Sequence, residues 1–277
     1  MKNIIGILSR TNGQIGFGLL AIVFLAALFG AIHPPYDPIA TNFSERFLSP
    51  GEKHLLGTDM FGRDLLSRIL VGASSSVLVS LLTVILTITF GVLLGSICGL
   101  LRGWFDRGVM MVLETLMAFP GLLLALALMT IIGPNKYGVI FALSLAYLPS
   151  VTRLVRGTVM SIREKEYVEA SIALGNSMIY TLFRHILPNC VAPLIVFGSA
   201  MFGWVLLAES ALSFLGLGVP PPAPTWGNML AEARTYLIRF PWLGVLPGIC
   251  IAITLLGVNF FGDALRDKLD PRSVNKK

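Results

Sequence analysis

Six apolar stretches alternate with polar segments along the 277 residues of the chain. An α-helix needs about 20 mostly apolar residues to cross the hydrocarbon core of a membrane, and each stretch is close to that length or longer. The pattern therefore predicts an all-α polytopic membrane protein with six transmembrane helices. We expect these helices at residues 15–32, 70–101, 108–132, 137–155, 190–217 and 242–264.

The polar segment between the fourth and fifth spans, residues 163–189, is both highly charged and helical in period. Its mostly apolar stripe repeats at helical spacing and consists of Tyr167, Ala170, Ser171 and Leu174. Glu166 and Glu169 place negative charge where a helix N-terminus favours it, and Gly175 is a natural C-terminal stop. We expect a short helix, a break at Gly175, and a second helical stretch that ends at Pro188 and leads into the fifth span.

This predicted helix has two interpretations. A short amphipathic helix presented by a hairpin suits a groove on a soluble partner protein. The same pattern suits an interfacial helix that lies on lipid headgroups. Both interpretations place the segment at the surface of the membrane.

Composition and charge narrow the class of protein. Hydrophobic residues make up 55% of the chain and charged residues 13%, whereas soluble domains carry about a quarter charged residues. The net charge of +6 is explained by where the basic residues lie, namely in the two ends of the chain and in the loops 102–107 and 153–189. Cytoplasmic loops carry the excess of Lys and Arg. We therefore expect both termini in the cytoplasm and no nucleic-acid partner.

The predicted organisation has four parts. They are a cytoplasmic N-terminus (1–14), a first transmembrane helix with an extracytoplasmic loop (15–69), a core of five transmembrane helices that includes the loop 163–189 (70–264), and a cytoplasmic tail (265–277).

Glycine and proline positions predict how the spans pack and bend. Small residues on one helix face let another backbone approach closely, and the second span has Gly91, Gly95, Gly99 and Gly103 at four-residue spacing. Prolines kink membrane helices, and we expect kinks at Pro120, Pro149 and Pro193.

Two acidic residues, Glu114 and Glu209, lie well inside predicted spans. Carboxylates inside a membrane usually face a bundle interior or a wet pathway. Both residues are candidates for lining a translocation pathway. Each residue also has an alternative explanation that is equally good. Glu114 could form an ion pair at the membrane interface, and Glu209 could pair with another residue within the bundle.

The extracytoplasmic side offers a second set of candidates. Asp59, Arg63 and Asp64 lie where a loop enters the second span, and either cap and cross-link an external hairpin or form a surface that receives another protein. Trp226 follows a stiff proline-rich run at 219–224, so we expect it in a rigid external loop near the mouth of the pathway.

Several kinds of chemistry have no motif in this chain. The sequence lacks the GxxxxGK[ST] phosphate cradle, HExxH and GxSxG. Its three cysteines are isolated and its three histidines are scattered, so we expect no metal site. An enzyme is therefore not predicted.

Three stretches resemble one family. The run Glu169-Ala170-Ser171, Gly175 four residues later, and then Leu187-Pro188 resemble the EAA loop of binding-protein-dependent ABC importer permeases. Ser171 is a departure, because the family usually has Ala there, and His185 stands where the general pattern has Ile. HLLGTDMFGRDLLSR at 54–68, the segment from Glu209 into the proline-rich run, and the ending at 262–271 resemble the C-type permease of peptide/nickel importers.

The resemblance implies a type I importer permease (MetI-like) fold in a bacterial inner membrane. It implies a permease subunit that forms half of a pathway for peptides or nickel/metal chelates. The implied partners are a second homologous permease, two cytoplasmic ATPases that bind the ATP, an extracytoplasmic solute-binding protein, and membrane lipid. An ATP-independent secondary transporter or channel is the alternative. The residues that the resemblance assigns to ATPase coupling are Glu166, Tyr167, Glu169, Ala170, Ser171, Leu174, Gly175, Leu187 and Pro188.

Overall fold

A computed structural model describes residues 11–269 and confirms the all-α class. Five helices in these residues are long and apolar enough to cross a membrane, and the number rises to six if a bent pair of shorter helices counts as one span. The long helices are α2 (Thr11–Ile32), α3 (Leu65–Leu101), α6 (Lys136–Arg163), α9 (Leu187–Phe214) and α11 (Trp242–Leu269). Residues 1–10 and 270–277, with the tail charges predicted there, lie outside the described residues.

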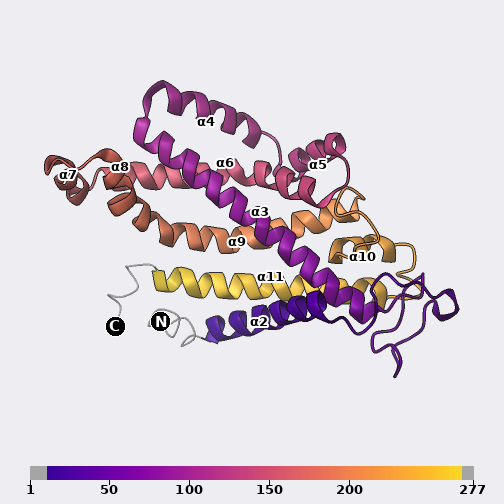
Figure 1. The fold of residues 1–277 in the computed structure, drawn as a ribbon. Coiled ribbons are helices and arrows are strands. Elements are labelled where there is room, and N and C mark those ends of the chain that lie inside the picture. Colours follow the sequence, from indigo (N-terminus) through magenta and orange to yellow (C-terminus); the bar gives the residue numbers. More distant parts are fainter. Residues whose placement is uncertain (1–10, 270–277) are drawn as a thin grey trace.

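The long helices form an elongated bundle with different structures at its two ends (Figure 1). At one end lie the short helix α7 (Glu166–Ala173) and the described ends of the chain. At the opposite end lie the segment 33–64, with its 3₁₀ turn at Phe43–Glu45, and helix α10 (Trp226–Ala233). Helix α3 runs obliquely from the second end to the first, so it touches structures at both.

The glycine stripe of α3 packs closely against another helix of the bundle. A Cβ atom added at Gly91 would lie 2.4 Å from Val151 Cγ1, and one added at Gly95 would lie 2.7 Å from the Thr152 carbonyl oxygen. The close approach predicted from the spacing is therefore confirmed, and the partner is α6. The fourth glycine, Gly103, has φ +70° and nothing within 4 Å, because it forms the turn between α3 and α4.

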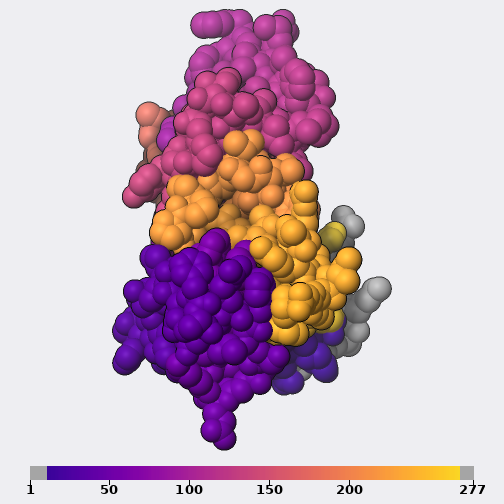
Figure 2. Space-filling view, turned by 90° about the vertical axis from the view of Figure 1, so that its right-hand side faces the viewer, coloured from indigo at the N-terminus to yellow at the C-terminus, as the bar shows by residue number. Residues whose placement is uncertain are grey.

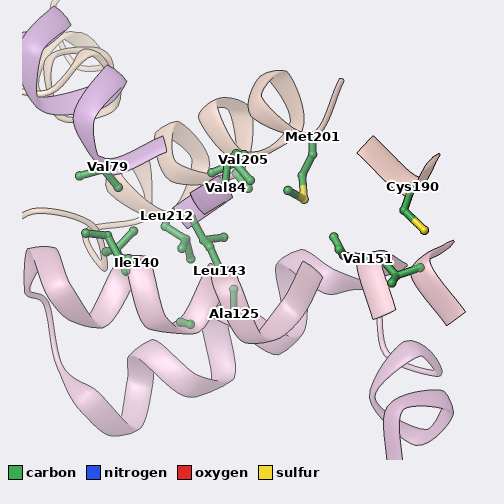
Figure 3. Packing of buried hydrophobic residues seen from close by; sticks show 14 of the residues in the cluster. Val79, Val84, Ala125, Ile140, Leu143, Val151, Cys190, Met201, Val205 and Leu212 are labelled. Atoms are coloured by element: carbon green, nitrogen blue, oxygen red, sulfur yellow. The ribbon is translucent and has the colours of Figure 1, made fainter. Parts of the chain in front are cut away.

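Apolar side chains from α3, α5, α6 and α9 meet in one buried cluster (Figure 3). Val79 and Val84 of α3 lie opposite Ile140 and Leu143 of α6, and Leu212 of α9 approaches the same region. Inside a membrane such side chains hold helices together by van der Waals packing, because lipid tails are as apolar as the side chains themselves. This cluster fixes α6, which continues toward α7.

The third span differs from the prediction. Residues 108–132 do not form one continuous helix, since α4 (Gly103–Met117) and α5 (Gly121–Ile132) meet at an angle of 90°. Pro120 causes the break: it has no N–H for a helical hydrogen bond, and it disfavours helical backbone in the preceding residue. Pro120 instead has an extended backbone and begins α5.

The second half of the 163–189 loop also differs from the prediction. Helix α8 (Met178–Thr181) continues through a π-helical segment (Leu182–Ile186) into α9, so the helical stretch does not end at Pro188. The Leu187 N–H bonds the Leu182 carbonyl in the wider π pattern. That wider turn gives the Pro188 ring room that an α-helical turn would not.

Candidate functional site

Two residues separate the end of α6 from the start of α7, and α7 ends just before Gly175, where the sequence predicted a stop. Gly175 has φ +87°, its N–H bonds the Ile172 carbonyl at 2.9 Å, and the Asn176 N–H bonds the Ser171 carbonyl at 3.2 Å. A side chain at Gly175 would strain this left-handed backbone. The glycine therefore fixes the angle at which the chain leaves the helix.

One face of α7 is tied to its own subunit. Val168 is fully buried, and Ser171 is 3% exposed. Ser171 Oγ lies 3.1 Å from Thr181 Oγ1 and accepts a hydrogen bond from Asn176 Nδ2 at 3.2 Å. Ser171, predicted in the apolar stripe and among the coupling residues, therefore faces its own subunit, because its hydroxyl joins α7 to α8 across the Gly175 turn.

The opposite face of α7 is exposed. Leu174 is 83% exposed and Tyr167 46%, and the other predicted residues on this face are Glu166, Glu169 and Ala170. Pro188 is exposed at the start of α9, while Leu187 packs against the buried cluster. Leu187 therefore supports the hairpin from within.

The exposed apolar surface also includes residues beyond those predicted. Ile179 and Phe183 are 69% and 66% exposed. The Tyr180 and Tyr167 rings lie 6.1 and 6.5 Å from the His185 ring, measured between centroids. The apolar residues after Gly175 gave a helical signal. The π-helical turn changes the angular positions of the side chains around the helix, and therefore decides which of these residues face outward.

The extracytoplasmic residues predicted as a docking surface are buried. Asp59, Arg63 and Asp64 are each at most 5% exposed. Arg63 Nε lies 2.6 Å from Asp59 Oδ2, and Glu232 Oε2 accepts hydrogen bonds from Arg63 at 2.7 Å and Arg68 at 2.9 Å. Of the two interpretations of these residues, the burial favours cross-linking, because Asp59 and Arg63 belong to an ion-pair network between the 33–64 segment and α10.

Asp64 and Trp226 secure the same end of α3. Asp64 caps the helix by accepting the Ser67 N–H at 2.8 Å, and its other oxygen lies 2.8 Å from His54 Nδ1. Trp226 is 2% exposed, and its Nε1 donates to the Ile69 carbonyl at 3.1 Å. Trp226 therefore anchors α10 to α3 and presents no surface to a partner.

A weaker ion pair lies on the surface of the 33–64 segment. The ammonium of Lys53 donates a hydrogen bond to Glu45, and this bond lowers the pKa of the Glu45 carboxyl. Figure 2 shows the outer surface of this end, where the violet 33–64 segment abuts the orange and yellow segments around α10. The exposed pair contributes little compared with the buried network.

The two acids inside spans have different surroundings. Glu209 is fully buried within the subunit, where its Oε1 accepts a hydrogen bond from Ser213 at 2.8 Å. Glu114 is exposed on α4 and lies 3.8 Å from Arg153. Glu209 is thus enclosed within the subunit, and Glu114 forms the ion pair that one of its interpretations expected. Within residues 11–269, no three His, Cys, Asp or Glu side chains are grouped to hold a metal ion.

Comparison with known proteins decides the family. Residues 91–275 match the family described as "Binding-protein-dependent transport system inner membrane component". The chain belongs to this family. It is a multi-pass inner-membrane permease subunit, a non-catalytic component of a transporter.

Relatives of this permease cover nearly its whole length. A protein of Brucella suis named for a peptide transport system permease is 43% identical over 269 residues, covering 96% of this chain and 90% of that one. The di/tripeptide transport system permease protein DppC of Pseudomonas aeruginosa is 41% identical over 276 residues, covering 96% and 90%.

A solved structure confirms the fold of the permease. A chain of the MetNI methionine ABC transporter, in an inward-facing conformation, superposes with a TM-score of 0.61 and 15% sequence identity. The match covers 73% of this chain and 96% of that one. The MetI-like fold predicted from the sequence is therefore confirmed.

Proposed function

We propose that this permease imports peptides and that α7 is the coupling helix, which seats in a cleft of a cytoplasmic ATPase. The observation that carries the proposal is the division of α7 into two faces. Val168 and Ser171 hold one face to the bundle, while Tyr167 and Leu174 expose apolar surface on the other. A helix that is fixed on one side and free on the other passes a partner's displacement to the spans.

On this proposal, the end of the bundle that carries α7 is cytoplasmic, and residues 33–64 and α10 are outside. The basic residues support this orientation, since those at the α7 end include Arg102, Arg107, Arg153, Arg163, Lys165 and Arg184. A second homologous permease completes the pathway. Two ATPase subunits bind and hydrolyse ATP, and an extracytoplasmic solute-binding protein delivers the substrate.

Peptides are the proposed substrate class because the relatives that match nearly the full chain carry peptide or di/tripeptide names. The sequence resemblance also allows nickel or metal chelates. These substrates are separated by comparing uptake of labelled di- and tripeptides with uptake of labelled nickel chelates in the reconstituted complex.

Cysteine crosslinking tests the role of α7. Leu174→Cys, in a cysteine-free background, is expected to crosslink to the ATPase subunit in membranes. Ile238→Cys is the matched control, because Ile238 is fully exposed but lies at the opposite end of the bundle. Glu169→Lys is expected to abolish substrate-stimulated ATP hydrolysis while the permease still inserts into the membrane.

The alternative, an ATP-independent transporter or channel, predicts different results. Purified permease alone would then carry peptide into liposomes, and Leu174→Cys would form no crosslink to an ATPase. Those two results together would overturn the proposed function.

A further inference from the structure

Helix α4 is loosely held by apolar contacts. Its buried residues are Asp106, Met110 and Leu113, whereas Trp104 is 85% exposed and Met111 68%. The helix lies along the edge of the bundle and turns through 90° into α5 (Figure 1). With so little apolar burial, the position of α4 depends on polar contacts.

The principal polar contact joins α4 to α6. Arg156 Nε lies 2.5 Å from Asp106 Oδ1, and Arg156 Nη2 lies 2.6 Å from Asp106 Oδ2. The Asp106 side chain is 8% exposed and that of Arg156 27%. Two parallel bonds from one guanidinium fix both the distance and the orientation of the carboxylate. The pair therefore sets how α4 sits on α6.

Arg156 lies two helical turns before the end of α6, close to α7. The same part of α6 is clamped to α3: a Cβ atom added at Gly99 would lie 2.7 Å from Val159 Cγ1, and Arg163 Nη1 donates to the Leu100 carbonyl at 2.7 Å. The ends of α3 and α6 are thus one block. A displacement of α7 reaches this block directly.

The other side of α7 is built differently. There the chain continues through the Ser171–Thr181 contact into the π-helical segment and Pro188. Segments of π-helix frequently lie at functional sites. The α6 side of α7, by contrast, leads directly into the block formed by the ends of α3 and α6.

We infer that Asp106 and Arg156 are positioning residues for energy coupling: they make α4, and the bend into α5, move with α6 when an ATPase moves α7. This role rests on the proposed function of α7. It adds a specific requirement, because α4 must keep its distance from α6 in every nucleotide state.

The test uses the full complex with its ATPases and binding protein, reconstituted in liposomes. Spin labels at Met111→Cys on α4 and Ser161→Cys on α6, in a cysteine-free background, report the distance between the two helices without nucleotide and with ATP and vanadate. In the wild type we expect the same distance in both states. In Asp106→Asn we expect a broadened distribution that changes with nucleotide.

Transport provides the functional measurement, with labelled dialanine as the probe. Allosteric couplings of this kind are typically worth about 5- to 150-fold, so Asp106→Asn should lower peptide transported per ATP by about tenfold. Arg156→Lys keeps the positive charge but cannot form two parallel hydrogen bonds to the carboxylate, so it should lower peptide transported per ATP by a smaller factor. Glu164→Gln is the matched control, because it breaks the exposed Arg102–Glu164 pair, 3.1 Å apart, and should leave the ratio unchanged.

The charge-reversed double variant Asp106→Arg with Arg156→Asp separates positioning from folding, since it restores an ion pair with opposite polarity. Partial recovery of the transport ratio would support the inference. Wild-type transport per ATP in Asp106→Asn, or an α4–α6 distance that changes with nucleotide in the wild type, would overturn it. If Leu174→Cys still crosslinks to the ATPase in those experiments, the proposed function survives and only the role of the pair fails.

Discussion

The packing of α3 on α6 leads to a prediction that can be worked out atom by atom. At Gly95, the first side-chain carbon would lie 2.7 Å from the Thr152 carbonyl oxygen, 2.7 Å from Val155 Cβ and 3.0 Å from the Arg156 nitrogen. Two of these atoms belong to the α6 backbone and cannot rotate away. In Gly95→Val, the branched side chain has little rotamer freedom in a helix, so the two helices must separate.

Gly157→Val is the matched control for this substitution. Gly157 also lies inside a long helix, but a Cβ atom there has nothing within 4 Å. Both variants change glycine to valine within a helix, so the effect of helix propensity is nearly the same in each. The difference between the two variants therefore measures the packing of α3 on α6. Overpacking of a tight interior typically costs about 1–3 kcal/mol, and we expect the upper part of that range for Gly95→Val.

The measurement is the free energy of unfolding of the purified permease in mixed micelles, obtained by titration with sodium dodecyl sulfate and followed by circular dichroism. A difference of about 3 kcal/mol corresponds to a change of roughly 100-fold in the unfolding equilibrium. If Gly95→Val and Gly157→Val unfold within about 0.5 kcal/mol of each other, below the expected overpacking cost, the close α3–α6 contact does not exist in the protein.

Two further substitutions test the buried charges. Glu232→Gln leaves the Arg63 and Arg68 guanidiniums without a shared carboxylate, so it should destabilise the protein by about 3 kcal/mol and lower its melting temperature. Lys53→Gln is the control on the exposed surface, and it should leave the melting temperature unchanged. Equal effects of the two substitutions would contradict the network. Glu209→Gln keeps an oxygen that can accept the hydrogen bond from the Ser213 hydroxyl. Transport by the reconstituted complex should therefore stay within about twofold of wild type. A loss of transport at unchanged stability would instead place Glu209 in the pathway.

The parts of the fold that the sequence predicted depend on local information. The length of each apolar stretch decides whether a helix can cross the membrane, and the stop at Gly175 follows from its freedom to adopt positive φ. The glycine spacing in α3 likewise predicted a close contact with another helix. It did not identify α6 as the partner, because that requires knowing which face of each helix turns inward.

What the sequence could not decide depends on contacts between distant parts of the chain. Asp59 and Arg63 were open to two interpretations, and the choice depends on Glu232, 169 residues beyond Arg63, which completes their buried network. Ser171 has the spacing of the predicted apolar stripe, but its contact with Thr181 holds it against its own subunit. Pro120 was expected to kink a helix, and whether such a kink becomes a 90° break depends on how α5 packs against α6.

Helix α3 explains how events at the two faces of the membrane can be connected. At the end near α10, Arg68 shares Glu232 with Arg63, and the Ile69 carbonyl accepts a hydrogen bond from the Trp226 side chain of α10. At its other end, the glycine stripe and the Leu100 carbonyl hold it to α6, which leads directly to α7. These contacts lie at opposite ends of a single 37-residue helix. A movement of α6 that carries this end of α3 must therefore either tilt α10 and the 33–64 segment with it or break buried ion pairs, and breaking the ion pairs costs more free energy.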